Sequence, residues 1–222
     1  MKKAVCLLSG GMDSYVTAKI AKDSGFEIYA LAFNYGQRHF KEMDCARKIA
    51  EKLEVSEFKS IDVNLQGIFK STLTFSGEIP NANNSENTVP STYVPARNTL
   101  FLSFALGYAE SIKSNDIFIG ISQVDYSGYP DCRQEFLNAF ENLANLATCA
   151  GINGEKYKIH APLINMPKWK EIILGLKMGV DFSLTWTCYK GKKRACGVCD
   201  SCKLRLEAFE KAGIIDPIEY EI

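Results

Sequence analysis

The sequence predicts an α/β fold, in which one parallel β-sheet is covered by helices on both faces. Short apolar runs typical of buried strands alternate along the 222 residues with longer segments of helical periodicity. Glycines follow several of the helical segments, as is common at the carboxyl end of a helix. The composition, 46% hydrophobic and 23% charged, excludes a disordered or coiled-coil chain. We therefore expect a single domain over residues 1–222.

The first half of the chain begins this alternation. An apolar run at residues 4–8 predicts a buried strand, and Met12, Val16 and Ile20 recur at helical spacing behind it. We expect further strands at residues 27–35 and 58–63, and helices at residues 12–24 and 39–54.

The second half continues the pattern after one interruption. Residues 71–92 are rich in Asn, Ser, Thr and Pro and show no periodicity, which is typical of a disordered segment or a functional lid. Beyond them we expect helices at residues 98–114, 133–150, 168–178 and 200–212, and strands at residues 117–121 and 157–163. In such a sheet, ligands bind at the carboxyl ends of the strands.

Charge and hydropathy disfavour several classes of protein. The 26 basic and 26 acidic residues cancel, whereas proteins that bind nucleic acid over a large surface usually carry a basic excess. The uncharged run at residues 98–109 is too short to span a membrane. Lys2 and Lys3 precede only five apolar residues, too few for a signal peptide. We expect a cytoplasmic protein with reduced cysteines and no membrane or direct nucleic-acid partner.

A glycine-rich turn connects the first expected strand to the first expected helix. It reads Ser9-Gly10-Gly11-Met12-Asp13-Ser14. Its glycines let the backbone approach an anion, and the helix amino terminus and two serine hydroxyls offer hydrogen-bond donors. It has neither the Gly-Lys-Ser/Thr of a Walker loop nor the spacing of a dinucleotide loop. It is predicted to bind phosphate groups; the alternative is a purely structural turn.

Basic residues in the last third of the chain are harder to interpret. Lys168 follows Pro167 at the start of an expected helix, where it is equally suited to reach bound phosphates or to face solvent. A basic run is formed by Lys190, Lys192, Lys193 and Arg194. A solvated loop is the simpler interpretation of this run, and contact with RNA or a partner is the alternative.

Four of the eight cysteines lie within fifteen residues, at Cys188, Cys196, Cys199 and Cys202. In a reducing compartment this density predicts a metal site, and four thiolates favour structural zinc in the region 185–212. An iron–sulfur cluster or metal-free thiols are the alternatives, although the Cys-Pro of a ferredoxin run is missing. Cys132 follows the fourth expected strand and is either a nucleophile or a packed thiol. The cysteines at positions 6, 45 and 149 are expected to pack.

The glycine-rich turn resembles the pyrophosphate loop of the PP-loop ATP pyrophosphatases, whose fold is Rossmann-like. Further strings are residues 33–39 (FNYGQRH), 94–98 (VPARN), 125–133 (DYSGYPDCR) and 196–202 (CGVCDSC). Together, over residues 2–212, they resemble the family of 7-cyano-7-deazaguanine synthases. The resemblance implies a ligase that converts 7-carboxy-7-deazaguanine and ammonia into an amide and then a nitrile, using ATP and magnesium at both stages of this step in queuosine precursor biosynthesis. It also implies a homodimer.

The resemblance further implies roles for individual residues. ATP would be bound by Leu8, Ser9, Gly10, Gly11, Met12, Asp13, Ser14 and Phe33, and catalysis would involve Asp13, Arg38, His39, Arg97 and Lys168. The deazaguanine substrate would contact Asn98, Asp125, Tyr129, Asp131 and Arg133. The two aspartates in that set suit the N–H edge of a guanine-like base. Asn98 is equally suited to be the N-cap of its helix, and His39 to be a plain polar residue at a helix start.

Two other functions stay open on the sequence alone. One is a PP-loop enzyme that modifies tRNA, against which the zero net charge and the length argue. The other is a zinc-ribbon binding module on a nucleotide-sensing domain without catalysis. Substrate-dependent release of AMP separates the ligase from the binding module.

Overall fold

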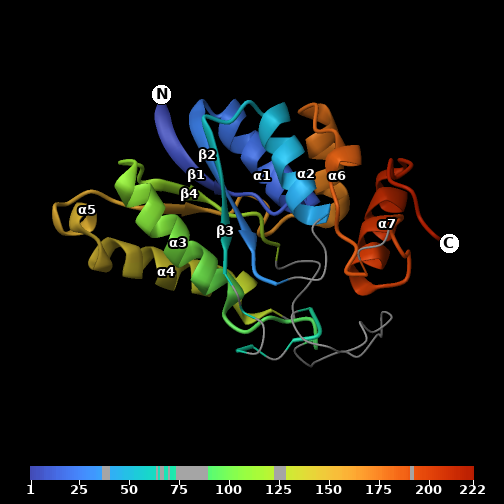
Figure 1. Ribbon diagram of the computed structural model, residues 1–222. Helices are drawn as coiled ribbons and strands as arrows, with labels where there is room; N and C mark the ends of the chain where they lie inside the picture. Colours follow the sequence, from blue (N-terminus) through green and yellow to red (C-terminus); the bar gives the residue numbers. More distant parts are fainter. Residues whose placement is uncertain are drawn as a thin grey trace.

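The computed structural model describes residues 1–36, 41–63, 65, 68–69, 71–73, 90–122, 129–190 and 193–222. Its centre is a parallel sheet of five strands in the order β3-β2-β1-β4-β5 (Figure 1). The strands are β1 (Lys2–Leu7), β2 (Phe26–Asn34), β3 (Glu57–Asp62), β4 (Asp116–Phe118) and β5 (Lys158–His160). The predicted α/β fold with a parallel sheet is confirmed.

Helices cover both faces of the sheet (Figure 1). One face carries α1 (Met12–Asp23), α2 (Lys41–Lys52) and α6 (Lys168–Lys177), and the other carries α3 (Arg97–Ser111) and α4 (Gln134–Ala147). The short α5 (Cys149–Ile152) follows α4, and α7 (Asp200–Ala212) packs against α6. Because strand side chains alternate between faces, Val5 and Leu7 join one core while Ala4 and Cys6 join the other.

Strand β1 lies where the order of the strands reverses. From it, β2 and β3 extend to one side and β4 and β5 to the other. Ala4 is in register with Ile28 of β2 and with Asp116 of β4. In open parallel sheets, ligands bind beyond the carboxyl ends of the strands at such a reversal. The segments that follow β1, β2 and β4 are therefore the ones to inspect.

The expected elements lie close to their predicted bounds, with two differences. The helix expected at 133–150 is interrupted because Thr148 adopts an extended conformation. Its Oγ1 accepts a hydrogen bond from the amide of Gly151 (3.1 Å), so Thr148 is the N-cap of the next helix, α5. The strands expected at 117–121 and 157–163 pair over three residues each, as β4 and β5. After β4, Gly120 packs against the backbone of Asp13 and Ser14 in the glycine-rich turn. Residues 39–40 of the expected second helix lie outside the described residues.

The interruption at 71–92 is described only at its two ends. The amide of Thr72 donates to the carbonyl of Ser91 (3.0 Å), so the ends lie together. Residues 74–89 lie outside the described part, and the lid or disorder expected there stays a prediction. Among the described helices, none combines the length and the apolar character needed to cross a membrane.

Candidate nucleotide and metal site

The turn between β1 and α1, residues 9–14, forms a closed loop of hydrogen bonds. Ser14 Oγ donates to the carbonyl of Gly11 (2.9 Å) and accepts from the amide of Ser9 (3.2 Å). Ser9 Oγ donates to Ser14 Oγ (3.1 Å) and accepts from the amide of Gly11 (3.3 Å). No side chain caps α1 at Gly11, so amides of the first helical turn face the loop. A helix amino terminus with adjacent hydroxyls is suited to bind an anion.

Two glycines are required here by close backbone approach. Gly10 has φ +86°, and a Cβ on it would lie 2.2 Å from the carbonyl oxygen of Glu42 in α2. Gly120, after β4, packs against the other side, where a Cβ would lie 2.6 Å from the carbonyl carbon of Asp13. Any larger residue would push the loop out of place. The sequence pattern singled out Gly10 but gave no signal for Gly120.

Lys168 reaches the loop from the start of α6. Its Nζ lies 2.5 Å from Asp13 Oδ1 and 3.4 Å from Glu171 Oε2. The Glu171 side chain is completely buried. Burial and the nearby charge of Asp13 raise the pKa of Glu171 well above its usual value, while Lys168 acts in the opposite direction. The structure thus places Lys168 beside the loop, and it adds Glu171, which no sequence motif indicated.

Arg97 begins α3 on the opposite side of the loop. Its Nη1 donates to the Tyr35 hydroxyl (3.5 Å). Burial lowers the pKa of Arg97, but the combined effect of Tyr35, Tyr129 and Asp131 raises it by more. The pKa therefore lies above its usual value, and the guanidinium stays charged. Glu42, near Arg97, has its pKa raised to about 7 by burial, with Arg97 opposing. A fixed positive charge beside the loop suits a carboxylate or phosphate ligand.

Asn98 joins α3 to the 3-10 helix η1 (Pro130–Cys132). Its amide donates to Asp131 Oδ2 (3.0 Å) and its Nδ2 donates to the Asp131 carbonyl (3.0 Å). Ala96, with φ 52°, occupies the N-cap position of α3. The alternative that Asn98 is the N-cap is therefore wrong: Asn98 is the second helical residue, and the Asp131 carboxylate supplies the missing acceptor for its amide.

The other predicted residues after β4 lie at different depths. The Tyr129 hydroxyl is 2.9 Å from Thr92 Oγ1. Cys132 is buried, and burial raises its pKa to about 11, which favours a packed thiol over a nucleophile. Arg133 is exposed and its Nε donates to the Pro130 carbonyl (3.1 Å). Arg133 does not line either of the cavities described next.

Two adjoining cavities of about 240 Å³ each meet at the glycine-rich loop. The first extends between apolar side chains that include Leu8, Phe33 and Phe101. The rings of Phe33 and Phe101 stack with their centroids 4.1 Å apart. The second is lined by the charged side chains of Asp13 and Lys168, neither of which lines the first. Their shared lining is Ser9, Gly11, Arg97, Gly120, Ile121, Thr187, Tyr189 and Ser201. An aromatic chamber joined to a charged one at an anion loop suits a nucleotide with its phosphates at the junction.

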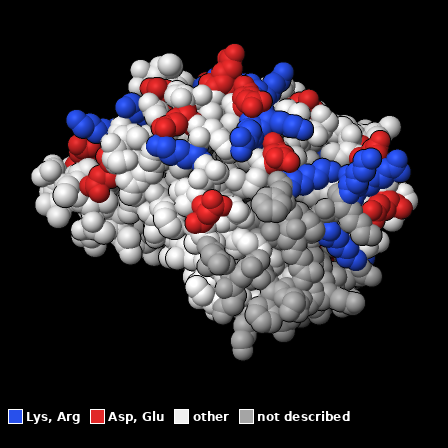
Figure 2. All heavy atoms as spheres, viewed as in Figure 1, with Lys and Arg blue, Asp and Glu red and all other residues white. Residues whose placement is uncertain are grey.

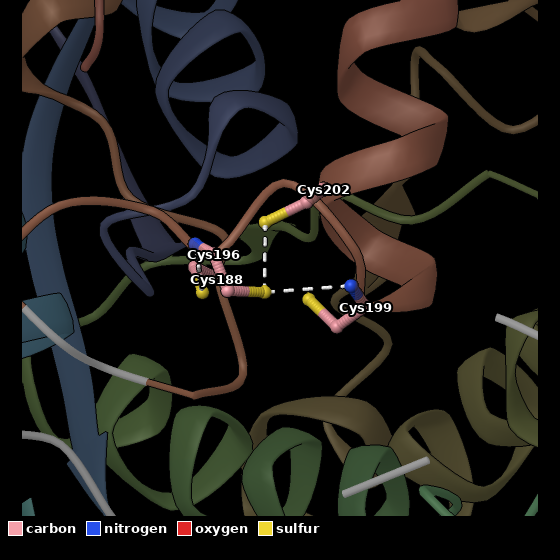
Figure 3. Close-up of side chains that lie close together, drawn as sticks. All are labelled: Cys188, Cys196, Cys199 and Cys202. Atoms are coloured by element: carbon pink, nitrogen blue, oxygen red, sulfur yellow. Dashed lines mark hydrogen bonds between the residues drawn. The ribbon is translucent and has the colours of Figure 1, made fainter. Parts of the chain in front are cut away.

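The four clustered cysteines form a compact group beside the cavities (Figure 3). Their sulfurs lie within 4.8 Å of one another, and all four residues are buried. Cys196 Sγ is 3.9 Å from Cys202 Sγ and accepts the amide of Cys199 (3.4 Å). Zinc with bonds of about 2.3 Å to four thiolates would hold sulfurs roughly 3.8 Å apart, so this group fits such an ion. The pKa of Cys188 is lowered by hydrogen bonds from Cys199 and Cys202.

Comparison with known proteins gives the family. A family model described as "Queuosine biosynthesis protein QueC" matches residues 3–213. The chain belongs to this family. A QueC relative from Clostridium kluyveri, named 7-cyano-7-deazaguanine synthase, is 50% identical over 223 residues, covering 100% of this chain and 99% of its own. One of the same name from Syntrophotalea carbinolica is 52% identical over 222 residues, covering 99% and 96%.

Solved structures also resemble this QueC chain. The NMN synthetase of Francisella tularensis matches with a TM-score of 0.50 and 16% identity, over 96% of this chain and 78% of that one. At this identity the likeness concerns the fold alone. The resemblance to the synthase family and its Rossmann-like PP-loop fold, expected from the sequence, are confirmed.

The structure brings many predicted residues of this QueC chain together and leaves others undescribed. The glycine-rich loop, Phe33, Arg97, Asn98, Tyr129 and Lys168 all line the cavities, Gly10 excepted, whose carbonyl faces away toward Trp186. Asp131 lies behind Asn98. Arg38, His39 and Asp125 lie outside the described residues. Glu42, Glu171 and Trp186 were missed, because each owes its place in the site to a residue distant in sequence, respectively Arg97, Asp13 and Gly10.

Proposed function

We propose that this chain converts 7-carboxy-7-deazaguanine and ammonia into 7-cyano-7-deazaguanine, forming AMP and pyrophosphate from ATP at each of two activation steps. Relatives about half identical over their full length bear the name of this activity, which bears out the ligase expected from the sequence. The observation that carries the chemical proposal is the lining of the second cavity. There, the anion-binding loop, Lys168 and Arg97 surround one space.

ATP binding is proposed for the loop and the apolar cavity. The amides and hydroxyls between Ser9 and Ser14 hold the phosphates, and the Phe33 end of β2 lies beside the adenosine. The Lys168 ammonium, which pairs with Asp13, exchanges this partner for the departing pyrophosphate and neutralises part of its charge. Magnesium, bound with ATP, supplies further charge neutralisation for the phosphates. Leu8 lines the first cavity and Met12 the second.

The reaction follows from activation of oxygen. A carboxylate oxygen of the substrate attacks the α-phosphorus of ATP, and pyrophosphate leaves. Ammonia then attacks the acyl carbon, AMP leaves and a proton is lost, giving the amide. The amide oxygen is adenylated in the same way, and loss of AMP and of both N–H protons leaves the nitrile. Arg97, charged and beside the loop, stabilises the negative oxygens in both activations.

The deazaguanine ring is proposed to lie toward the segment after β4. Tyr129 and Asn98 line the cavities there, and Asp131 supports Asn98. Asp125, and the catalytic assignments of Arg38 and His39, remain proposals on residues outside the described part. Arg133, which is exposed and lines neither cavity, is proposed to lie at the outer end of this segment.

Zinc is proposed for the four cysteines, where it would hold residues 185–212 as part of the single domain 1–222. Four sulfur ligands leave no open position, so this role is structural. The charge distribution is consistent with small-molecule substrates and no direct nucleic-acid partner: Figure 2 shows basic and acidic side chains interspersed over one face. We further propose a cytoplasmic homodimer, for which exposed Leu143, Leu146 and Ile152 around α4 and α5 offer apolar surface.

The test is an incubation with ATP, magnesium, ammonium and 7-carboxy-7-deazaguanine. AMP, pyrophosphate and a product with the mass of the nitrile should appear only when the carboxylate substrate is present. An Asp131→Asn enzyme with unchanged affinity for that substrate would contradict a role for Asp131 in the substrate site. Bound zinc without any substrate-dependent AMP would favour the non-catalytic binding module.

A further inference from the structure

Trp186 lies between the glycine-rich loop and the cysteine group. Its backbone amide donates to the carbonyl of Gly10 (2.9 Å). Its indole Nε1 donates to the carbonyl of Cys188 (3.1 Å), and the residue is 3% exposed. One buried side chain and its own amide therefore connect a phosphate-loop residue to a metal-ligating residue two positions along the chain.

Gly10 has little freedom to move away from this contact. It is wedged against the carbonyl of Glu42 in α2, at a position where even a Cβ would overlap. Its φ is +86°, a conformation that favours glycine, and its carbonyl accepts the hydrogen bond from the Trp186 amide described above. The position of Trp186 thus bears directly on the conformation of the loop.

Lys41, the first residue of α2, contacts the indole ring of Trp186. Its ammonium lies 3.3 Å from the centroid of the indole ring, at close cation–π distance. The same Nζ donates to the carbonyl of Lys193 (2.9 Å), which lies in the loop between Cys188 and Cys196. The start of α2 therefore contacts the tryptophan and the metal-binding loop together.

The residue before Trp186 is fixed from the third side. Arg205 of α7 donates from Nη1 to Thr185 Oγ1 (2.7 Å). Helix α7 also carries Cys202, one of the four clustered cysteines. The segment from Thr185 to Cys188 is thus held at one end by α7, through Arg205, and at the other by the cysteine group, to which α7 contributes Cys202. Trp186, Thr187 and Cys188 also line the first cavity.

We propose that Trp186 couples the metal centre to the phosphate loop, so that zinc and ATP each strengthen the binding of the other. The proposal rests on the proposed function, in that the loop must bind ATP. Trp186 is a positioning residue here, because it is proposed to act through its contacts with Gly10, Cys188 and Lys41. Coupling between two sites is reciprocal, so it can be read at either ligand.

The readout is the affinity of the protein for zinc, measured by competition with a chromogenic chelator with and without saturating magnesium-ATP. In the parent protein ATP should strengthen zinc binding about tenfold, within the usual range of coupling between sites. Trp186→Phe, which keeps the ring and the backbone amide but loses Nε1, should reduce this effect to about threefold, and Trp186→Ala should abolish it. Trp169→Phe changes the other tryptophan of the chain and should retain the full effect.

Calorimetric titration of ATP into the same zinc-loaded proteins separates the possible failures. If the parent protein binds ATP but its affinity for zinc is unchanged, the coupling is refuted. It is equally refuted if Trp186→Phe and Trp186→Ala both retain the full effect. If the zinc-loaded parent protein binds no ATP, the proposed function fails first. If Trp186→Ala does not fold, Trp186→Phe alone tests the coupling. In Trp169→Phe, where Trp186 is the remaining tryptophan, its fluorescence must also change when ATP binds.

Discussion

Arg205 offers a stability test whose size can be worked out from the structure. Its guanidinium pairs with Asp216 through Nε–Oδ2 (2.7 Å) and Nη2–Oδ1 (2.9 Å), and the two side chains are 0% and 4% exposed. Nη2 also donates to the carbonyl of Phe182 (3.2 Å) in the 3-10 helix η2 (Phe182–Leu184), and Nη1 to Thr185. The network joins α7, η2 and the carboxyl-terminal tail.

Arg205→Met removes the charged partner of the buried Asp216 carboxylate, which keeps only the neutral donors Tyr220 Oη and the Ile218 amide. Loss of one partner from a buried pair costs about 3–5 kcal/mol of unfolding free energy. For a chain of this size each kcal/mol lowers the melting temperature by about 2–4 °C, so a fall of about 6–20 °C is expected. Urea denaturation and thermal melting of the zinc-loaded protein measure both quantities.

The matched control is Arg194→Met. Arg194 also pairs with a carboxylate, Glu219, at 2.9 Å, but its side chain is 61% exposed and that of Glu219 is 76% exposed. An exposed pair contributes less than about 1 kcal/mol. If Arg205→Met and Arg194→Met lower the unfolding free energy equally, burial does not decide the strength of these pairs and the reasoning is refuted.

Three further predictions concern the loop and its neighbours. Lys168→Met should lower substrate-dependent AMP formation about 100-fold through loss of a charged phosphate contact, whereas exposed Lys170→Met should change it little; equal losses would contradict the role. Because burial raises the pKa of Glu171, the folded protein retains a proton that the unfolded chain releases as pH rises, and stability falls across that interval. Glu171→Gln should therefore lose less melting temperature than the parent between about pH 5 and pH 8, and an equal loss would refute the raised pKa. Gly10→Ala should cost about 2 kcal/mol more than Gly154→Ala, because both glycines have positive φ but a Cβ meets backbone only at Gly10; similar costs by urea denaturation would contradict this.

The parts of the fold set by local pattern were predictable from the sequence. Apolar runs and helical spacing located the strands and helices because burial on a sheet face imposes those periods. The interruption at Thr148 was not predictable by that route, since the side chains on both sides keep the helical pattern while a single hydroxyl changes the backbone.

The candidate site divides in the same way. Glycine-rich and cysteine-rich strings are compact in sequence, so their chemistry could be inferred without a structure. Glu42, Glu171 and Trp186 have no such string, because each acquires its environment from a segment far along the chain. Asn98 shows the limit of a local rule: its residue type suits an N-cap, but Asp131 approaches from η1 and takes over the acceptor role.

The number of AMP molecules formed for each nitrile tests the central claim most directly. If one cavity activates first the carboxylate and then the amide, zinc-loaded protein supplied with ATP, ammonium and 7-carboxy-7-deazaguanine should form two AMP for each 7-cyano-7-deazaguanine. The isolated amide, supplied in place of the carboxylate, should give one. A ratio of one from the carboxylate, or nitrile formed without AMP, would contradict repeated activation at this loop.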